Sequence, residues 1–253
     1  MNDRAIAYGP PLPLPALLLG AILTGVLVLL AAQRMRNGSG AYLVGATWFR
    51  YIISAFQAAS TTMVGPFSII ALSSLAMFGG GLMLVRPRLL ALKFMLPIYV
   101  MCGVVLVSGI ANQEFVGTVN VLIKYGFFAV VTLCTFQALS ATPEGRFTRL
   151  LLFAFLPLIL FQLFGMALGV VKSGENDGSV SNIGGYSHEA TFSVMLITML
   201  VAVALTTRIN PYIKFGFVGA AIVGIYLANY RTSMLAILPL MAVLFGLVPA
   251  GKF

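Results

Sequence analysis

Charged side chains are scarce in this sequence. Of its 253 residues only 8% are Asp, Glu, Lys or Arg, while 60% are hydrophobic. A soluble domain usually carries about 25% charged residues. Long stretches hold no charge at all, for example between Arg4 and Arg34 and between Arg50 and Arg86. Because about 20 apolar residues suffice to cross a membrane as a helix, the composition excludes a soluble globular fold and predicts an all-α, polytopic transmembrane helical bundle.

Cysteine, histidine and acidic residues are also few. Cys102 and Cys134 both lie inside apolar runs, so they indicate neither a disulfide framework nor a thiolate metal site. One histidine and six scattered acidic residues cannot build a closed metal site. The net charge is +9, but the basic residues form no cluster of the kind that binds nucleic acid. We therefore expect no metal, no cofactor and no nucleic acid.

The apolar runs predict about nine membrane spans in one transmembrane domain covering residues 1–253. The predicted segments are 12–32, 42–61, 67–85, 89–110, 118–139, 149–171, 188–207, 212–228 and 232–249. Segment 42–61 is the weakest because Arg50 and Gln57 interrupt it, and whether it spans fully stays open. One substantial polar loop, 172–187, is rich in Gly and Ser, which predicts flexibility and a place for function.

The positions of Lys and Arg in the short loops predict the orientation. With nine spans, nine basic residues lie on one side, which should be cytoplasmic: Arg34, Arg36, Arg86, Arg88, Arg146, Arg149, Arg208, Lys214 and Lys252. Only Arg4 and Lys172 lie on the other side. The sequence thus predicts a multi-pass protein whose polar loop 172–187 is on the outer face.

Ionisable side chains gather toward that outer face. His188 and Glu189 begin the seventh segment, and Arg231 begins the ninth. Lys124 and Arg50 lie within predicted spans, where charge is costly and normally faces the bundle interior or a wet cavity. Helix N-termini beside arginine favour anions such as phosphate. We therefore expect these five residues to line a single cationic cavity that opens outward.

Structural readings of the same residues remain open. Arg50 is also explained by a bond to a backbone carbonyl, and Lys124 by a side chain that extends toward the interface. A lone histidine at a membrane surface, such as His188, is often only an interfacial residue. The sequence therefore leaves two interpretations of these residues open: a shared cationic cavity, or separate structural roles for each side chain.

Short motifs resemble a known family. The segment from Ile183 to Val194, the segment from Asn229 to Ala236 with Arg231 and Leu235 four residues apart, and the segment from Trp48 to Ile53 carry the resemblance. Together with the polar loop, they are similar to the O-antigen ligase and O-antigen polymerase superfamily of bacterial envelopes. Within that superfamily they resemble a subgroup associated with exopolysaccharide loci.

The resemblance implies a metal-independent glycosyltransferase of the bacterial inner membrane whose active face is periplasmic. The donor would be a glycan on undecaprenyl pyrophosphate, and the acceptor a sugar hydroxyl. Arg231, Arg50 and Lys124 would bind the pyrophosphate, and His188 or Glu189 would act on the acceptor. Family members usually continue beyond this length, so the resemblance also predicts a split or truncated member, with a partner polypeptide supplying the remaining C-terminal part.

A second hypothesis is a transporter or flippase for an anionic, lipid-linked substrate. Transporters often show internal repeats and helices broken at the midplane. No repeat is visible here, and the ionisable groups gather toward one face. An inactive scaffold is the third reading. The sugar, the acceptor, the choice between ligase and polymerase, and the oligomeric state are not encoded in any motif.

Overall fold

The computed structural model describes residues 10–35, 37–58, 62–142, 145–173, 180–206 and 209–244. The described chain is all-α apart from two short antiparallel hairpins, β1 (Met63–Val64) with β2 (Phe67–Ser68) and β3 (Lys172–Ser173) with β4 (Val180–Ser181). The helices are α1 (Leu14–Gln33), α2 (Gly38–Ala55), α4 (Ile69–Leu82), α5 (Pro87–Leu90), η1 (Lys93–Met95), α6 (Leu96–Ala111), α7 (Phe115–Ala141), α8 (Arg146–Leu151), η2 (Leu152–Phe155), α9 (Leu156–Ala167), α10 (Glu189–Leu205), α11 (Pro211–Leu227) and α12 (Arg231–Leu244).

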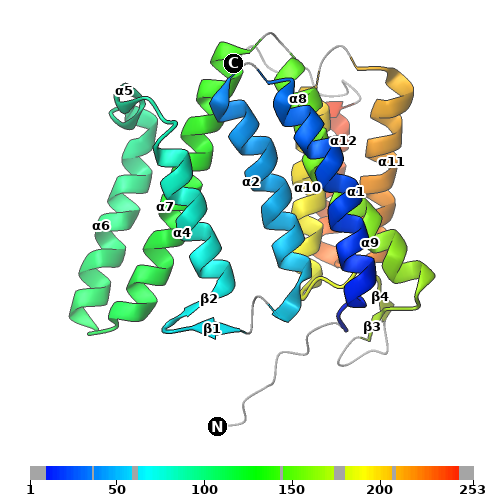
Figure 1. Cartoon of the computed structure of the whole chain (residues 1–253), viewed down its shortest axis with the longest axis horizontal. Coiled ribbons are helices and arrows are strands. Elements are labelled where there is room, and N and C mark those ends of the chain that lie inside the picture. The colour runs from blue at the N-terminus through cyan, green and yellow to red at the C-terminus, as the bar shows by residue number, and fades with distance from the viewer. Residues whose placement is uncertain are drawn as a thin grey trace.

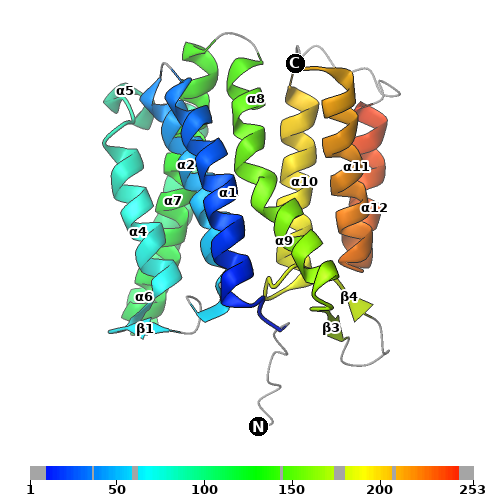
Figure 2. The same ribbon diagram turned by 45° about the vertical axis from the view of Figure 1, so that its right-hand side comes forward.

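The long helices stand side by side and alternate in direction along the chain (Figures 1 and 2). Both hairpins lie at the lower end of the bundle in Figure 1, which we call the hairpin end. At the opposite end α1 and α7 finish and α8 and α11 begin. We call this the arginine end, because Arg34, Arg86, Arg88, Arg146 and Arg149 flank its helix termini.

Four helical stretches in the described residues are long and apolar enough to cross a membrane: Leu14–Gln33, Lys93–Ala111, Phe115–Ala141 and Arg146–Ala167. Their outward faces are apolar. In α1, for example, Ile22 and Leu29 are 64% and 63% exposed, whereas Leu17 and Val28 are buried. Apolar exposure of this kind is expected where lipid replaces water as the solvent. The chain is therefore a multi-pass membrane protein.

Helices occupy all nine predicted segments, but their ends differ from the prediction. The largest difference is in α2, which spans Gly38–Ala55 instead of 42–61. It starts earlier because the Asn37 side chain accepts a hydrogen bond from the backbone N–H of Ser39 (3.0 Å), a typical N-cap. As a result Arg50 lies between the middle of its helix and the hairpin end, five residues before the last residue of α2. Residues 59–61, 207 and 245–249 of the predicted segments lie outside the described residues.

The predicted sixth span consists of α8, η2 and α9 in succession. Pro157 is in the first turn of α9 and has no backbone N–H, so it cannot donate to the carbonyl four residues earlier. The chain winds as a tighter 3-10 helix just before it, over Leu152–Phe155. The predicted span is therefore one continuous helical segment with a short 3-10 turn inside it.

Two hydrophobic clusters fill the interior. One lies mainly among α9, α10 and α11 and includes Phe161, Tyr186 and Phe192. The other joins α1, α2, α7 and α8 and includes Leu133 and Phe147. Trp48 of α2 packs against both clusters, and its indole N–H donates to the hydroxyl of Thr24 in α1 (2.9 Å).

A buried glutamine joins three segments at the arginine end. The amide nitrogen of Gln137 in α7 donates to the Ser39 hydroxyl (2.6 Å) and to the carbonyl of Leu84 (3.1 Å). Its amide oxygen accepts from the backbone N–H of Arg86 (3.2 Å). One side chain therefore satisfies polar groups at the start of α2 and in the connection after α4, away from water.

Replacing this amide with an isosteric hydrocarbon should destabilise the bundle. We expect Gln137→Leu to lower the free energy of unfolding by about 1–3 kcal/mol, because buried donors and acceptors lose their partners. The midpoint of thermal unfolding of the detergent-solubilised protein measures the effect. Thr132→Val is the matched control, since the Thr132 hydroxyl donates only within its own helix, to Phe128. Equal midpoints for the two variants would contradict the role assigned to Gln137.

Candidate functional site

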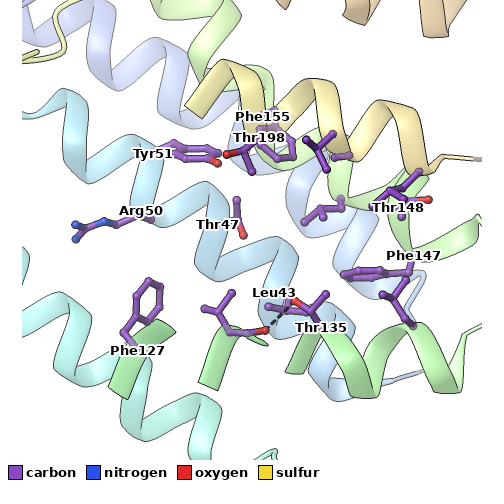
Figure 3. Close-up of a pocket in the computed structure, with 16 residues that line it drawn as sticks. Leu43, Thr47, Arg50, Tyr51, Phe127, Thr135, Phe147, Thr148, Phe155 and Thr198 are labelled. Carbon is purple, nitrogen blue, oxygen red and sulfur yellow. Dashed lines mark hydrogen bonds between the residues drawn. The ribbon is translucent and has the colours of Figure 1, made fainter. Parts of the chain in front are cut away.

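An apolar groove of about 350 Å³ runs between α2, α7, α8 with η2, and α10 (Figure 3). Three of its four threonine hydroxyls donate to carbonyls of their own segments: Thr135 to Val131 (2.7 Å), Thr148 to Gly145 (3.3 Å) and Thr198 to Val194 (2.9 Å). The walls therefore present mostly hydrocarbon. The residues that line it are Leu43, Thr47, Arg50, Tyr51, Phe127, Val131, Thr135, Leu139, Phe147, Thr148, Leu151, Phe155, Thr198, Val201, Ala202 and Leu205.

Arg50 is the charged residue among those lining this groove. Figure 3 shows it at one end of the groove, with Phe147 and Thr148 at the other. Phe147 and Thr148 are in the first turn of α8, so Arg50 marks the hairpin end of the groove. The side chain is half-buried, and its guanidinium donates to the hydroxyl of Ser74 in α4 (3.1 Å). A cation bonded to a neutral hydroxyl in apolar surroundings favours an anionic ligand.

Lys124 lies on the same face of α7 as the groove. Phe127 and Val131 line the groove, and Lys124 precedes them by three and seven residues, which places the three side chains on one helical stripe. Lys124 is exposed and lies about 13 Å from the start of α7, since each helical residue advances by about 1.5 Å. It therefore lies one turn beyond the groove toward the hairpin end.

Glu189 forms an ion pair that the sequence did not indicate. Its carboxylate accepts a hydrogen bond from the ammonium group of Lys172 (2.9 Å), and the two side chains are 22% and 11% exposed. The pair joins β3 to the first residue of α10. Lys172 is 17 positions away in the sequence, with the polar loop between, so no spacing rule would have revealed it.

His188 and Arg231 each precede or open a helix at the hairpin end. His188 is half-buried with an extended backbone, and its carbonyl accepts from the N–H of Phe192 (3.0 Å) at the start of α10. Arg231 is exposed and begins α12, which packs on α10 and α11. His188 is ten residues, or about 15 Å along the axis, from Thr198, the first groove residue of α10.

The structure thus places the five predicted residues in two groups. Arg50 lines the groove, and Lys124 continues its α7 wall. His188, Glu189 and Arg231 lie at the hairpin end on α10 and α12 and do not line the groove. This groove is therefore not a cavity that all five residues line.

The second half of the polar loop is buried, although its composition predicted flexibility. Residues 181–186 are all buried, and Tyr186 is 2% exposed. The Tyr186 hydroxyl donates to the carbonyl of Tyr51 in α2 (3.1 Å), and its ring packs on Phe192 (centroids 5.0 Å apart). Burial, and to a smaller extent Tyr51, raises the pKa of the Tyr186 phenol, so it remains a protonated donor.

Two glycines make this docking possible. Gly184 and Gly185 have φ angles of +59° and +81°, a region that glycine adopts without steric cost. A Cβ on Gly184 would lie 2.5 Å from the backbone of Phe161 and Gln162. The docked segment is held from the other side by Asn182, whose N–H donates to the carbonyl of Leu227 (2.8 Å). In the sequence, the two adjacent glycines followed by an aromatic residue were the one feature that could have indicated this docked segment.

Gly184→Ala should release the docked segment. The added methyl group meets backbone that cannot rotate away, and we expect a loss of about 2 kcal/mol or more in the free energy of unfolding. Hydrogen exchange of residues 182–188, together with thermal unfolding, measures this. The control is Gly219→Ala in α11, where a Cβ meets open space and helix propensity favours alanine. Unchanged protection of 182–188 in Gly184→Ala would refute the docking argument.

No known family model, curated protein or solved structure matches this chain.

Proposed function

We propose that the chain is a membrane glycosyltransferase of the O-antigen ligase or polymerase type that acts on an undecaprenyl pyrophosphate-linked glycan. The observation that carries the proposal is Arg50, a half-buried cation at the hairpin end of an apolar groove between membrane helices. A polyisoprenyl pyrophosphate has the matching chemistry, because its anionic head is joined directly to a long hydrocarbon chain. The polyisoprenyl hydrocarbon of the donor would lie along the groove, and Arg50 would bind its pyrophosphate head.

The proposal places the hairpin end at the periplasmic face of the bacterial inner membrane. The shorter apolar helices, Ile69–Leu82, Glu189–Leu205, Pro211–Leu227 and Arg231–Ala242, would cross the bilayer with the four longer ones and α2, giving nine spans. The arginines at the other end support this orientation, since basic loops stay in the cytoplasm. Of the described acidic residues, Glu114 and Glu189 are both at the hairpin end, which agrees with it.

The two groups of residues would divide the reaction between them. Arg50 and Lys124 would bind the pyrophosphate and stabilise the charge that develops on it as it leaves. The ion pair between Lys172 and Glu189 holds the start of α10 in place, which favours a positioning role for Glu189. His188, the neighbouring residue, would then be the base on the acceptor side.

In the proposed step an acceptor hydroxyl oxygen attacks the anomeric carbon of the donor glycan. The bond from that carbon to the pyrophosphate oxygen breaks, and its electron pair leaves with undecaprenyl pyrophosphate. The hydroxyl proton passes to the imidazole of His188. Arg231 would contact the phosphate or sugar of the donor from α12, where it shares a helical face with the apolar Leu235.

The proposal is tested by mixing the purified protein with an undecaprenyl pyrophosphate-linked oligosaccharide and candidate sugar acceptors in the presence of a chelator. We expect a larger glycan and release of undecaprenyl pyrophosphate. We expect Arg50→Lys to weaken donor binding at least about tenfold, because lysine lacks the planar fork that matches phosphate. Arg88→Lys, in the short helix α5 at the arginine end, is the control. Equal donor binding by Arg50→Lys and the parent protein would exclude Arg50 as a pyrophosphate ligand.

Arg231 provides a separate test in living cells. We expect Arg231→Lys to abolish glycan transfer while membrane insertion and abundance stay normal, because an exposed side chain at a helix start contributes little to folding. Polymer or ligated glycan is quantified in cells that lack any second copy of the protein. Full production by Arg231→Lys would remove Arg231 from the proposed site.

A further inference from the structure

Three arginine side chains converge on one pocket at the arginine end. A cavity of about 190 Å³ is lined by Arg34 at the end of α1, Arg146 and Arg149 of α8, and the apolar Leu150 and Phe153. The guanidinium of Arg146 donates to the carbonyl of Arg34 (2.9 Å), and Nε of Arg149 donates to the carbonyl of Gly145 (3.1 Å). Backbone contacts thus orient two of the three guanidinium groups around the cavity.

An apolar groove continues from this pocket into the bundle's side. It has a volume of about 470 Å³ and is lined by Leu152, Phe153 and Leu156 on one wall and by Ile209, Ile213 and Phe217 on the other, with Arg149 and Asn210 at its rim. Arg149 and Phe153 line both cavities, so the two are contiguous. The groove follows η2 and the first turns of α11 away from the arginine end, for about 10 Å between residues 149 and 156.

We infer that these two cavities form a binding site for an anionic phospholipid of the leaflet at the arginine end. The three arginines supply a concentrated positive charge, and guanidinium groups bind phosphate oxygens in pairs. The apolar groove receives an acyl chain, which distinguishes a lipid from free phosphate. This inference is independent of the proposed function.

The site is distinct from the Arg50 groove in both position and walls. The Arg50 groove uses Phe147, Thr148, Leu151 and Phe155 of the α8–η2 segment. The lipid site uses Arg149, Leu152, Phe153 and Leu156, together with α11. Successive residues of one segment therefore face two separate cavities.

The test titrates the purified full chain in detergent with dioleoyl phosphatidylglycerol and, separately, with dioleoyl phosphatidylcholine, and counts bound lipid by native mass spectrometry. We expect saturable binding of the anionic lipid, with an affinity at least about fivefold higher than that for the zwitterionic lipid. The reason is that each basic residue near a membrane surface adds electrostatic attraction for anionic lipid. Arg34→Gln should lower the affinity about fivefold, and Arg149→Gln likewise. Equal binding of the two lipids by the parent protein would overturn the inference.

Matched variants distinguish binding in this pocket from non-specific attraction to the positive charge at the arginine end. Arg88→Gln removes the same charge at the same end, outside the pocket, and should leave binding unchanged. Ile213→Trp fills the groove and should weaken binding of the dioleoyl lipid but not of dihexanoyl phosphatidylglycerol. An equal loss in Arg88→Gln, or displacement of the lipid by millimolar glycerol phosphate, would also overturn it. Arg34→Gln keeps the backbone carbonyl that Arg146 uses and changes an exposed side chain, so its folding is preserved.

Discussion

Two buried glutamines join the segments of this bundle where no water is available to satisfy polar groups. Gln137 binds polar groups of α2 and of the connection after α4. Gln162 of α9 plays the same part near the hairpin end. Its amide nitrogen donates to the carbonyls of Asn182 (2.8 Å) and Gly224 (3.0 Å), in the docked loop and in α11. Because an unmade hydrogen bond is costly in apolar surroundings, each amide fixes the relative positions of three segments. The docked loop, and with it the start of α10, depends on the second of these junctions.

The helical segments were predictable because they can be recognised from the length and hydropathy of consecutive residues alone. Runs without charge identified where helices lie, since length and hydropathy alone decide whether a segment can cross a membrane. Helix ends were less predictable, because they depend on caps such as Asn37 and on the winding imposed by Pro157. The burial of residues 181–186 was missed for a different reason. Glycine and serine predict flexibility on average, whereas here positive φ at Gly184 and Gly185 allows a close backbone approach to α9 that only the folded bundle provides.

The candidate site was only partly predictable, because the sequence does not determine how the helices are arranged around the bundle. The sequence gives the depth of a charged residue along the membrane normal, and on that basis Lys124, His188, Glu189 and Arg231 lay toward one face and Arg50 near the middle of its span. It does not give the position of each helix around the bundle. In the structure α2 packs against α7, while α12 packs against α10 and α11. Arg50 and Lys124 therefore lie on two neighbouring helices, and Arg231 lies on α12 beside α10 and α11. The Lys172–Glu189 pair was hidden for a related reason, because a hairpin brings two distant positions together.

The α8–η2–α9 segment connects the two ends of the molecule. In a regular α-helix residues 147, 148, 151 and 155 share one face, and 149, 152, 153 and 156 share the opposite one. The structure uses these two faces for two cavities, one with Arg50 at its hairpin end and the other with Arg149 at its arginine end. The 3-10 turn before Pro157 is the common wall between them. Lipids bound in both cavities would press on opposite faces of this one turn, each with its charged head at a different end.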